Sequence, residues 1–174
     1  VIGGGPIGQL VALVAKSVGA QVMVSELNDA RLKFAESNGL LSVNPLEQDI
    51  EAVVADWTSN KGADVVFEVS GVQPAVDTMT KIASVRGRIC MVAIHSQKPE
   101  VDLFQFFWKE LQLVGARVYE RDDFDMAIEL VASGKIDIEP FVSSISALED
   151  IGSAFASMEN NPTRMKALVY CGVE

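Results

Sequence analysis

The sequence predicts an α/β fold in which helices cover both faces of a doubly wound, six-stranded parallel sheet. Three observations support this. Short apolar runs alternate with segments of helical periodicity through roughly the first two-thirds of the chain. The run at residues 63–69 is nearly continuous, as expected for a strand buried on both faces. A glycine-rich turn at residues 3–8 stands between the first strand and the first helix. We therefore expect right-handed crossovers and the strand order 3-2-1-4-5-6.

Each element has its own local signal. Apolar residues at helical spacing predict a helix over residues 6–18, which stops at Gly19, and Asn28 is a candidate N-cap for a second helix through residue 37. Further helices are expected at residues 47–58 and 73–83. Only Val1 and Ile2 remain for the first strand, and the other strands are expected at residues 21–25, 41–43, 63–69, 88–94 and 111–116. Because a central strand typically has about five or six residues, we expect the chain to be a piece of a longer protein.

The regular alternation of predicted strands and helices ends after Arg117. We predict a helix over residues 123–132, a strand over 141–145, and a last strand over 165–170. Ser146-Ala147-Leu148-Glu149 has the capping-box pattern and would open a helix that runs to residue 158. The expected organisation is therefore a domain of residues 1–117 and a tail of residues 118–174 that completes another domain.

The composition is that of a globular protein, with 174 residues, 49% hydrophobic and 22% charged. A net charge of −10 argues against nucleic acid and anionic membrane surfaces as partners. No apolar stretch reaches about 18 residues. No signal peptide can be seen, but this says little, because the first residue is not expected to be the native N-terminus. The expected location is cytoplasmic. Cys90 and Cys171 are far apart and give no zinc or disulfide pattern, and Cys90 is interpreted as a small buried hydrophobe.

The glycine-rich turn has the pattern of a dinucleotide-binding fingerprint of the Rossmann type. Gly3 allows the tight turn, Gly5 lets a pyrophosphate approach the backbone, and Gly8 allows close packing of the helix. Pro6, followed by Ile7, suits the first helical turn. Glu26, eighteen residues after Gly8, would accept the ribose hydroxyls and repel a 2′-phosphate. The expected cofactor is therefore NAD, not NADP.

An ordered set of motifs resembles the zinc-dependent medium-chain dehydrogenase/reductase superfamily, in particular its polyol, threonine and butanediol dehydrogenases. The motifs are GGGPIG, SELNDARL, GADVVFEVSG, GRICMVAI, KELQLVGAR, ALEDIGSAF and KALV. The resemblance implies hydride transfer between a secondary alcohol or polyol and NAD, and a GroES-like catalytic domain upstream that the tail completes. It also implies a zinc ion held by upstream residues. We therefore expect no catalytic residue and no metal ligand in this chain, which would bind NAD without oxidising an alcohol.

The resemblance also implies roles for residues outside the glycine turn. Leu27 would pack on the adenine, and Arg31 would bracket the ribose or reach a phosphate, although an exposed helix arginine is a nearly equal alternative. Strand ends at the carboxyl edge of an open α/β sheet bind ligands. The resemblance assigns Ser70, Gly71 and Val72 to the adenosine side at this edge. It assigns the main chain of Val92, Ala93 and Ile94, at the end of the fifth strand, to the nicotinamide carboxamide.

Some residues stay open between a functional and a structural reading. His95, the only histidine, is interpreted as a loop residue more readily than as a base or metal ligand. Gly115-Ala116-Arg117, at the end of the sixth strand, would lie near the nicotinamide. The aromatic residues Phe104, Phe106, Phe107 and Trp108 are expected to be buried, with a substrate wall or a subunit contact as alternatives.

Other functions fit parts of the pattern. They are a non-catalytic NAD-sensing domain, a zinc-free quinone or enoyl reductase of the same superfamily, and, less well, an S-adenosylmethionine methyltransferase. A sensor would not need the tail, and the methyltransferase fold needs no proline at the start of its first helix. The resemblance further implies a homo-oligomer, a dimer or tetramer, that assembles through the exposed edge of the sixth strand.

Overall fold

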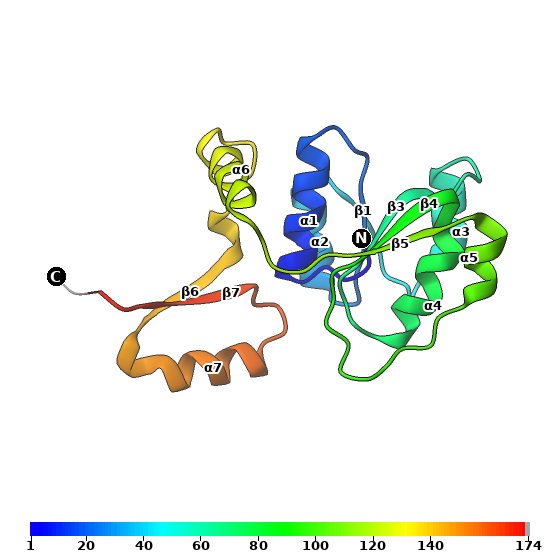
Figure 1. Cartoon of the computed structure of the whole chain (residues 1–174). Coiled ribbons are helices and arrows are strands. Elements are labelled where there is room, and N and C mark those ends of the chain that lie inside the picture. Colours follow the sequence, from blue (N-terminus) through cyan, green and yellow to red (C-terminus); the bar gives the residue numbers. More distant parts are fainter. Residues whose placement is uncertain (173–174) are drawn as a thin grey trace. The chain divides into compact units, whose positions relative to one another are not determined.

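The computed structural model describes residues 1–172 and contains two compact units, Val1–Tyr119 and a second that begins at Glu120 (Figure 1). In the first unit, α1 and α2 lie on one side of the strands and α3, α4 and α5 on the other (Figure 1). The elements of this unit are α1 (Pro6–Ser17), β1 (Met23–Ser25), α2 (Asp29–Ser37), β2 (Leu41–Val43), α3 (Ile50–Trp57), β3 (Ala63–Glu68), α4 (Gln73–Ile82), β4 (Ala83–Met91), α5 (Leu103–Lys109) and β5 (Gln112–Gly115).

The strands of the first unit are all parallel but form two ladders. One is β1-β2 and the other is β3-β4-β5. Ile2 makes parallel bridges to Ser25 and to Glu68 and so lies between the two ladders. The order of strands is thus the one expected from the sequence, but the structure has no single six-stranded ladder among residues 1–172. The reason is that Ile2 alone, with one bridge on each side, occupies the place of the first strand.

A groove of about 1070 Å³ continues from Ile2 along the amino-terminal ends of β1 and β3. Apolar side chains line it, including Leu10 and Val14 of α1, Val54 and Trp57 of α3, and Val65 of β3. The groove lies beside Val1 and Ile2, and most of the side chains that line it are apolar. The groove lies at the opposite end of the strands from the carboxyl edge, where α/β folds bind ligands.

Several local predictions are confirmed and others need correction. The Asn28 side chain caps α2 by accepting from the N–H groups of Ala30 (3.0 Å) and Arg31 (3.2 Å). The helix expected from residue 47 begins at Ile50, where Asp49 caps it. β4 ends at Met91, so Val92, Ala93 and Ile94 follow the fifth strand in a loop and do not end it. The ladder with β5 stops at Met91 and Gly115, and the N–H groups of Val92 and Ala93 bind the carbonyl oxygen of Glu68 at the end of β3.

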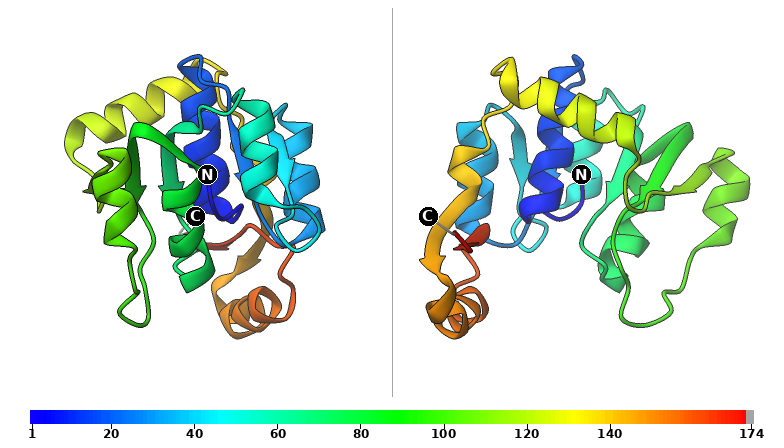
Figure 2. Two further views of the ribbon diagram at one scale, coloured as in Figure 1. Left: turned by 90° about the vertical axis from the view of Figure 1, so that its right-hand side faces the viewer. Right: turned by 60° about the vertical axis from the view of Figure 1, so that its left-hand side comes forward.

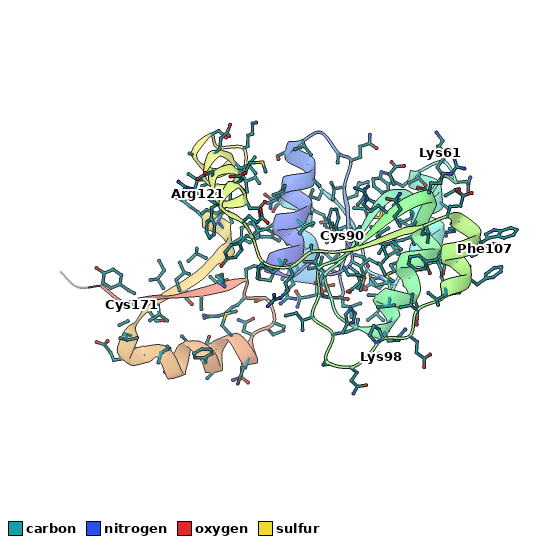
Figure 3. The ribbon with its side chains drawn as sticks, viewed as in Figure 1. Lys61, Cys90, Lys98, Phe107, Arg121 and Cys171 are labelled. Atoms are coloured by element: carbon teal, nitrogen blue, oxygen red, sulfur yellow. The ribbon has the colours of Figure 1, made fainter. Side chains whose placement is uncertain are left out.

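The aromatic segment forms a helix, α5, that the sequence analysis did not predict. The Asp102 side chain caps it. Phe106 packs against the core, but Phe104, Phe107 and Trp108 are 62–77% exposed, so their predicted burial is wrong. Phe107 projects outward from the helix (Figure 3). One face of a short helix can reach the core, and the other aromatic side chains therefore point to solvent.

The second unit contains α6 (Arg121–Ala132), η1 (Glu139–Phe141), β6 (Val142–Ala147), η2 (Leu148–Asp150), α7 (Ile151–Asn160) and β7 (Lys166–Tyr170). β6 and β7 pair in parallel, and α7 lies beside them (Figure 2). The predicted capping box is wrong: Ser146 pairs with Val169 within β6, and α7 begins at Ile151 without a side-chain cap. Within residues 1–172, no helix has both the length and the apolar character needed to cross a membrane.

Candidate functional site

The glycine turn runs from Ile2 into α1 and contacts the carboxyl end of β1 and the turn after β3. Gly3 has a φ of +103°, a conformation that favours glycine, and a Cβ there would lie 3.0 Å from the backbone nitrogen of Ser70. A Cβ at Gly8 would collide with the carbonyl oxygen of Gly3. A Cβ at Gly5 would meet one neighbour, Arg31 Nη1, at 3.8 Å. The turn is therefore closely packed at Gly3 and Gly8 and open at Gly5, so a ligand can approach the backbone at Gly5.

Helix α1 begins directly behind this opening. Pro6 is its first residue, Ile7 follows with its side chain 57% exposed, and the N-cap residue Gly5 supplies no side-chain hydrogen bond. The first N–H groups of a helix need partners from outside the helix and carry its positive dipole end. Such a helix start attracts phosphate and carboxylate groups.

The Glu26 carboxylate lies beside the turn and is held by main-chain donors. Its Oε1 accepts from the N–H groups of Leu27 (2.7 Å) and Asn28 (3.0 Å), and its Oε2 accepts from Gly4 N–H (2.8 Å). A carboxylate has about four acceptor positions, two on each oxygen. Oε1 is therefore saturated, whereas Oε2 keeps one acceptor position for a further donor such as a ribose hydroxyl.

Arg31 turns back from α2 toward the same opening. Its Nη1 lies 3.7 Å from Glu26 Oε2, and its side chain is 25% exposed. Its Nε is buried and has no hydrogen-bond partner in the part of the chain that the structure describes. A buried donor without a partner is costly, and a bound anion or hydroxyl oxygen would satisfy it. Together, the orphaned Nε and the open space above Gly5 fit the phosphate and ribose of a dinucleotide.

A second group of predicted residues lies along the same edge. Gly71 has a φ of +75°, and a Cβ there would be 2.9 Å from the carbonyl oxygen of Ile94, so the turn after β3 touches the loop after β4. The main-chain oxygen of Glu68 accepts from the N–H groups of Val92 (2.9 Å) and Ala93 (3.1 Å). Because Gly3 also contacts Ser70, the structure brings the glycine turn and both loops into one continuous edge.

The apolar members of the predicted site have exposed side chains. Leu27, Val72 and Ile94 are 55%, 52% and 96% exposed. Exposed apolar side chains along a polar edge suit the flat faces of aromatic ring systems. Residues 1–172 contain no group of three or more histidine, cysteine, aspartate or glutamate side chains arranged to hold a metal ion.

The sequence analysis missed three residues of this edge. Gln9 is fully buried in α1, and its Nε2 donates to the carbonyl oxygens of Gly4 (3.2 Å) and Arg31 (3.0 Å), which ties the turn to α2. Gly4 has no room for a side chain, because a Cβ would lie 2.9 Å from the Cβ of Glu26. Glu68 is fully buried at the end of β3. The available signal was a polar residue inside an apolar segment, which applies to Gln9 and Glu68.

The sequence is similar to known proteins. Residues 6–133 match the family described as zinc-binding dehydrogenase. The chain is 67% identical over 174 residues to 2-dehydro-3-deoxy-L-galactonate 5-dehydrogenase of Pseudoalteromonas atlantica (strain T6c / ATCC BAA-1087), and the match covers 100% of this chain and 51% of that protein.

Solved structures give the same result for the fold. The crystal structure of 2R,3R-butanediol dehydrogenase from Bacillus subtilis has a TM-score of 0.91 and 29% identity, covering 98% of this chain and 50% of that chain. A zinc-binding dehydrogenase from Sinorhizobium meliloti 1021, solved bound to NADP, has a TM-score of 0.85 and 27% identity, covering 97% of this chain and 50% of that chain. The chain therefore spans about half the length of the proteins it matches.

Proposed function

The chain belongs to the zinc-binding dehydrogenase family, and on this premise we propose that it is the NAD-binding part of a dehydrogenase that acts on a secondary alcohol or polyol. The observation that carries the proposal is the arrangement of Glu26 and Arg31 over the open glycine turn. One carboxylate oxygen keeps an acceptor position, and one buried guanidinium nitrogen lacks a hydrogen-bond partner among residues 1–172. An adenosine ribose and its phosphate would satisfy both.

Each predicted residue has a role in this proposal. The Gly3–Gly8 turn and the start of α1 hold the pyrophosphate, Glu26 Oε2 accepts a ribose hydroxyl, and Leu27 packs on the adenine. Ser70, Gly71 and Val72 line the adenosine side, and the main chain of Val92, Ala93 and Ile94 binds the nicotinamide carboxamide. When bound, NAD supplies the ring carbon that accepts a hydride from the alcohol.

The choice of NAD over NADP rests on charge. A 2′-phosphate would meet the Glu26 carboxylate, and Arg31, which already lies 3.7 Å from that carboxylate, would compensate for part of the repulsion only. The NADP found in one structural relative belongs to that protein. The nucleotide preference of this chain is therefore the first property to measure.

The substrate class follows from the relatives. One is named for a deoxy sugar acid and another for butanediol, and both names describe dehydrogenases of small hydroxylated molecules. We propose that the substrate of the whole protein is of this class and that its zinc ligands lie outside residues 1–174. In this proposal the chain alone binds NAD and turns over no alcohol.

We also propose how the chain fits into the whole protein. Residues 1–117 form the nucleotide-binding domain, and residues 118–174 complete a GroES-like catalytic domain. Residues upstream of Val1 fill the groove between β1 and β3, which makes the sheet six-stranded. The whole protein is then a cytoplasmic homo-oligomer, a dimer or tetramer, without nucleic-acid or membrane partners.

Two assays test this function. Titration of the full-length protein with NADH, NADPH and ADP-ribose tests nucleotide binding, and alcohol-dependent reduction of NAD tests the reaction. We expect NADH and ADP-ribose to bind and polyols to be oxidised. Nucleotide binding without turnover of any alcohol or polyol would support a sensor instead.

A further inference from the structure

Glu68 is a buried carboxylate that organises the turn after β3. Its side chain is 0% exposed. Its Oε1 accepts from the N–H of Ser70 (2.9 Å), the hydroxyl of Ser70 (2.6 Å) and the N–H of Gly71 (2.8 Å). One carboxylate oxygen is thus fully used within a single turn.

The other oxygen of Glu68 faces the loop after β4. Glu68 Oε2 lies 3.2 Å from Nε2 of His95, whose side chain is 13% exposed. The two atoms are close in distance, but neither makes a well-aligned hydrogen bond, to the other or to any other group, in the described part of the chain. The contact between His95 and Glu68 connects two loops that are separated by the whole of α4 and β4.

Polar contacts hold both ends of the Val92–His95 segment. The side chain of Ile94 is 96% exposed, so burial of Ile94 does not hold the segment in place. The N–H groups of Val92 and Ala93 donate to the main-chain oxygen of Glu68, and His95, at the end of the segment, contacts the Glu68 side chain. Three hydrogen bonds to Oε1 compensate for burial of this carboxylate, whereas Oε2 has the contact with His95.

We propose that Glu68 and His95 are positioning residues that fix the Ser70–Gly71 turn against the Val92–Ile94 segment, so that the main chain of that segment is aligned to bind the nicotinamide end of the cofactor. The inference rests on the proposed function. It predicts that breaking the pair weakens binding of the nicotinamide half and leaves the adenosine half, held by Glu26 and the glycine turn, unchanged.

The test compares three substitutions at one position in the full-length protein. His95→Leu removes the polar contact. His95→Gln keeps a donor nitrogen at the same number of bonds from Cα, and His95→Asn places it one bond short. Gln97→Leu, at an exposed position of the same loop, is the matched control. Binding of NADH, followed by its fluorescence, is compared with calorimetric binding of ADP-ribose, which lacks the nicotinamide.

The expected result is selective. His95→Leu and His95→Asn weaken NADH binding by about 3- to 10-fold, because the loop after β4 loses its contact with Glu68, and change ADP-ribose binding less than about twofold. His95→Gln and Gln97→Leu behave like the wild type. If His95→Leu does not fold, the comparison of Asn with Gln carries the test.

Two other results would overturn the inference. Equal loss of NADH and ADP-ribose binding would assign the pair to general stability, and unchanged NADH binding in His95→Leu and His95→Asn would remove any positioning role. Either result leaves the proposed function standing, because the wild type still binds NADH. A wild type that binds neither ligand would overturn the proposed function and this inference with it.

Discussion

Replacing Glu26 by glutamine should weaken NAD binding and relax the discrimination against NADP. The carboxylate accepts from main-chain N–H groups on both of its oxygens, from Leu27 and Asn28 on one side and Gly4 on the other. An amide has one acceptor oxygen, so one side must face its NH₂ group. The lost charge-assisted hydrogen bond costs about 1.5–3 kcal/mol. Since 1 kcal/mol corresponds to roughly 2–4 °C in a chain of this size, a lower Tm is expected as well.

The effect on selectivity follows from the lost charge. A carboxylate and a 2′-phosphate roughly 5 Å apart repel each other by about 3 kcal/mol per unit charge at an effective dielectric constant near 20. Arg31, 3.7 Å from the carboxylate, screens part of this. We therefore expect the ratio of the NADPH and NADH dissociation constants to fall by at least about tenfold, or 1.4 kcal/mol.

The assay is fluorescence titration of Glu26→Gln with NADH and NADPH at constant ionic strength. Glu36→Gln is the matched control. Glu36 lies on α2, and its carboxylate accepts a hydrogen bond from Ser42 Oγ (2.6 Å), not from a residue of the glycine turn. A folded Glu26→Gln protein with the wild-type ratio would refute the role of Glu26 as the selector.

Three further predictions concern the same unit. Gly71→Ala should lower the free energy of unfolding, measured by urea denaturation, by more than Gly19→Ala does. Both glycines have positive φ, but among the described residues a Cβ at Gly71 would lie 2.9 Å from the carbonyl oxygen of Ile94, whereas one at Gly19 would meet nothing within 4 Å. Equal losses would count against the contact between Gly71 and Ile94. Cys171, which is exposed, should react with a maleimide faster than Cys90, because partial burial raises the pKa of the Cys90 thiol and the thiolate is the nucleophile. The reaction rate of Cys90 should rise with pH. A faster reaction of Cys90 than of Cys171 at neutral pH would contradict the partial burial of Cys90. Four or five apolar residues added before Val1 should raise the free energy of unfolding, because they would cover groove side chains such as Val65, which is 45% exposed. Full burial of an exposed side chain contributes about 1.5–3 kcal/mol, and covering Val65 would contribute roughly half of that. A Gly-Ser extension of equal length that stabilised the chain as much would exclude strand insertion.

Local signals in the sequence predicted the glycine turn and the cap at Asn28, because both depend on residues within one turn of each other. The same kind of signal failed at Ser146, where the capping-box pattern competes with an alternating strand that pairs with β7. Long-range pairing decided that competition. Helix α5 was missed because a short segment with aromatic residues on every side shows no helical periodicity.

The contacts that complete the site depend on distant residues. The contact of Glu68 with His95 and that of Arg31 with Glu26 join segments that are far apart in the sequence, so the strand order must be known before either can be predicted. The sequence analysis placed His95 in a loop, which is correct, but a single histidine gave no sign of its partner. Buried polar residues inside apolar segments, such as Gln9 and Glu68, were the signal that pointed to the missed part of the site.

The central claim is that this edge of the sheet binds NAD. The most direct measurement is a calorimetric titration of the full-length, wild-type protein with NADH and with NADPH under identical conditions. We expect saturable binding of NADH with a dissociation constant at least about tenfold lower than that of NADPH. Equal affinity for the two nucleotides, or binding of neither, would contradict it.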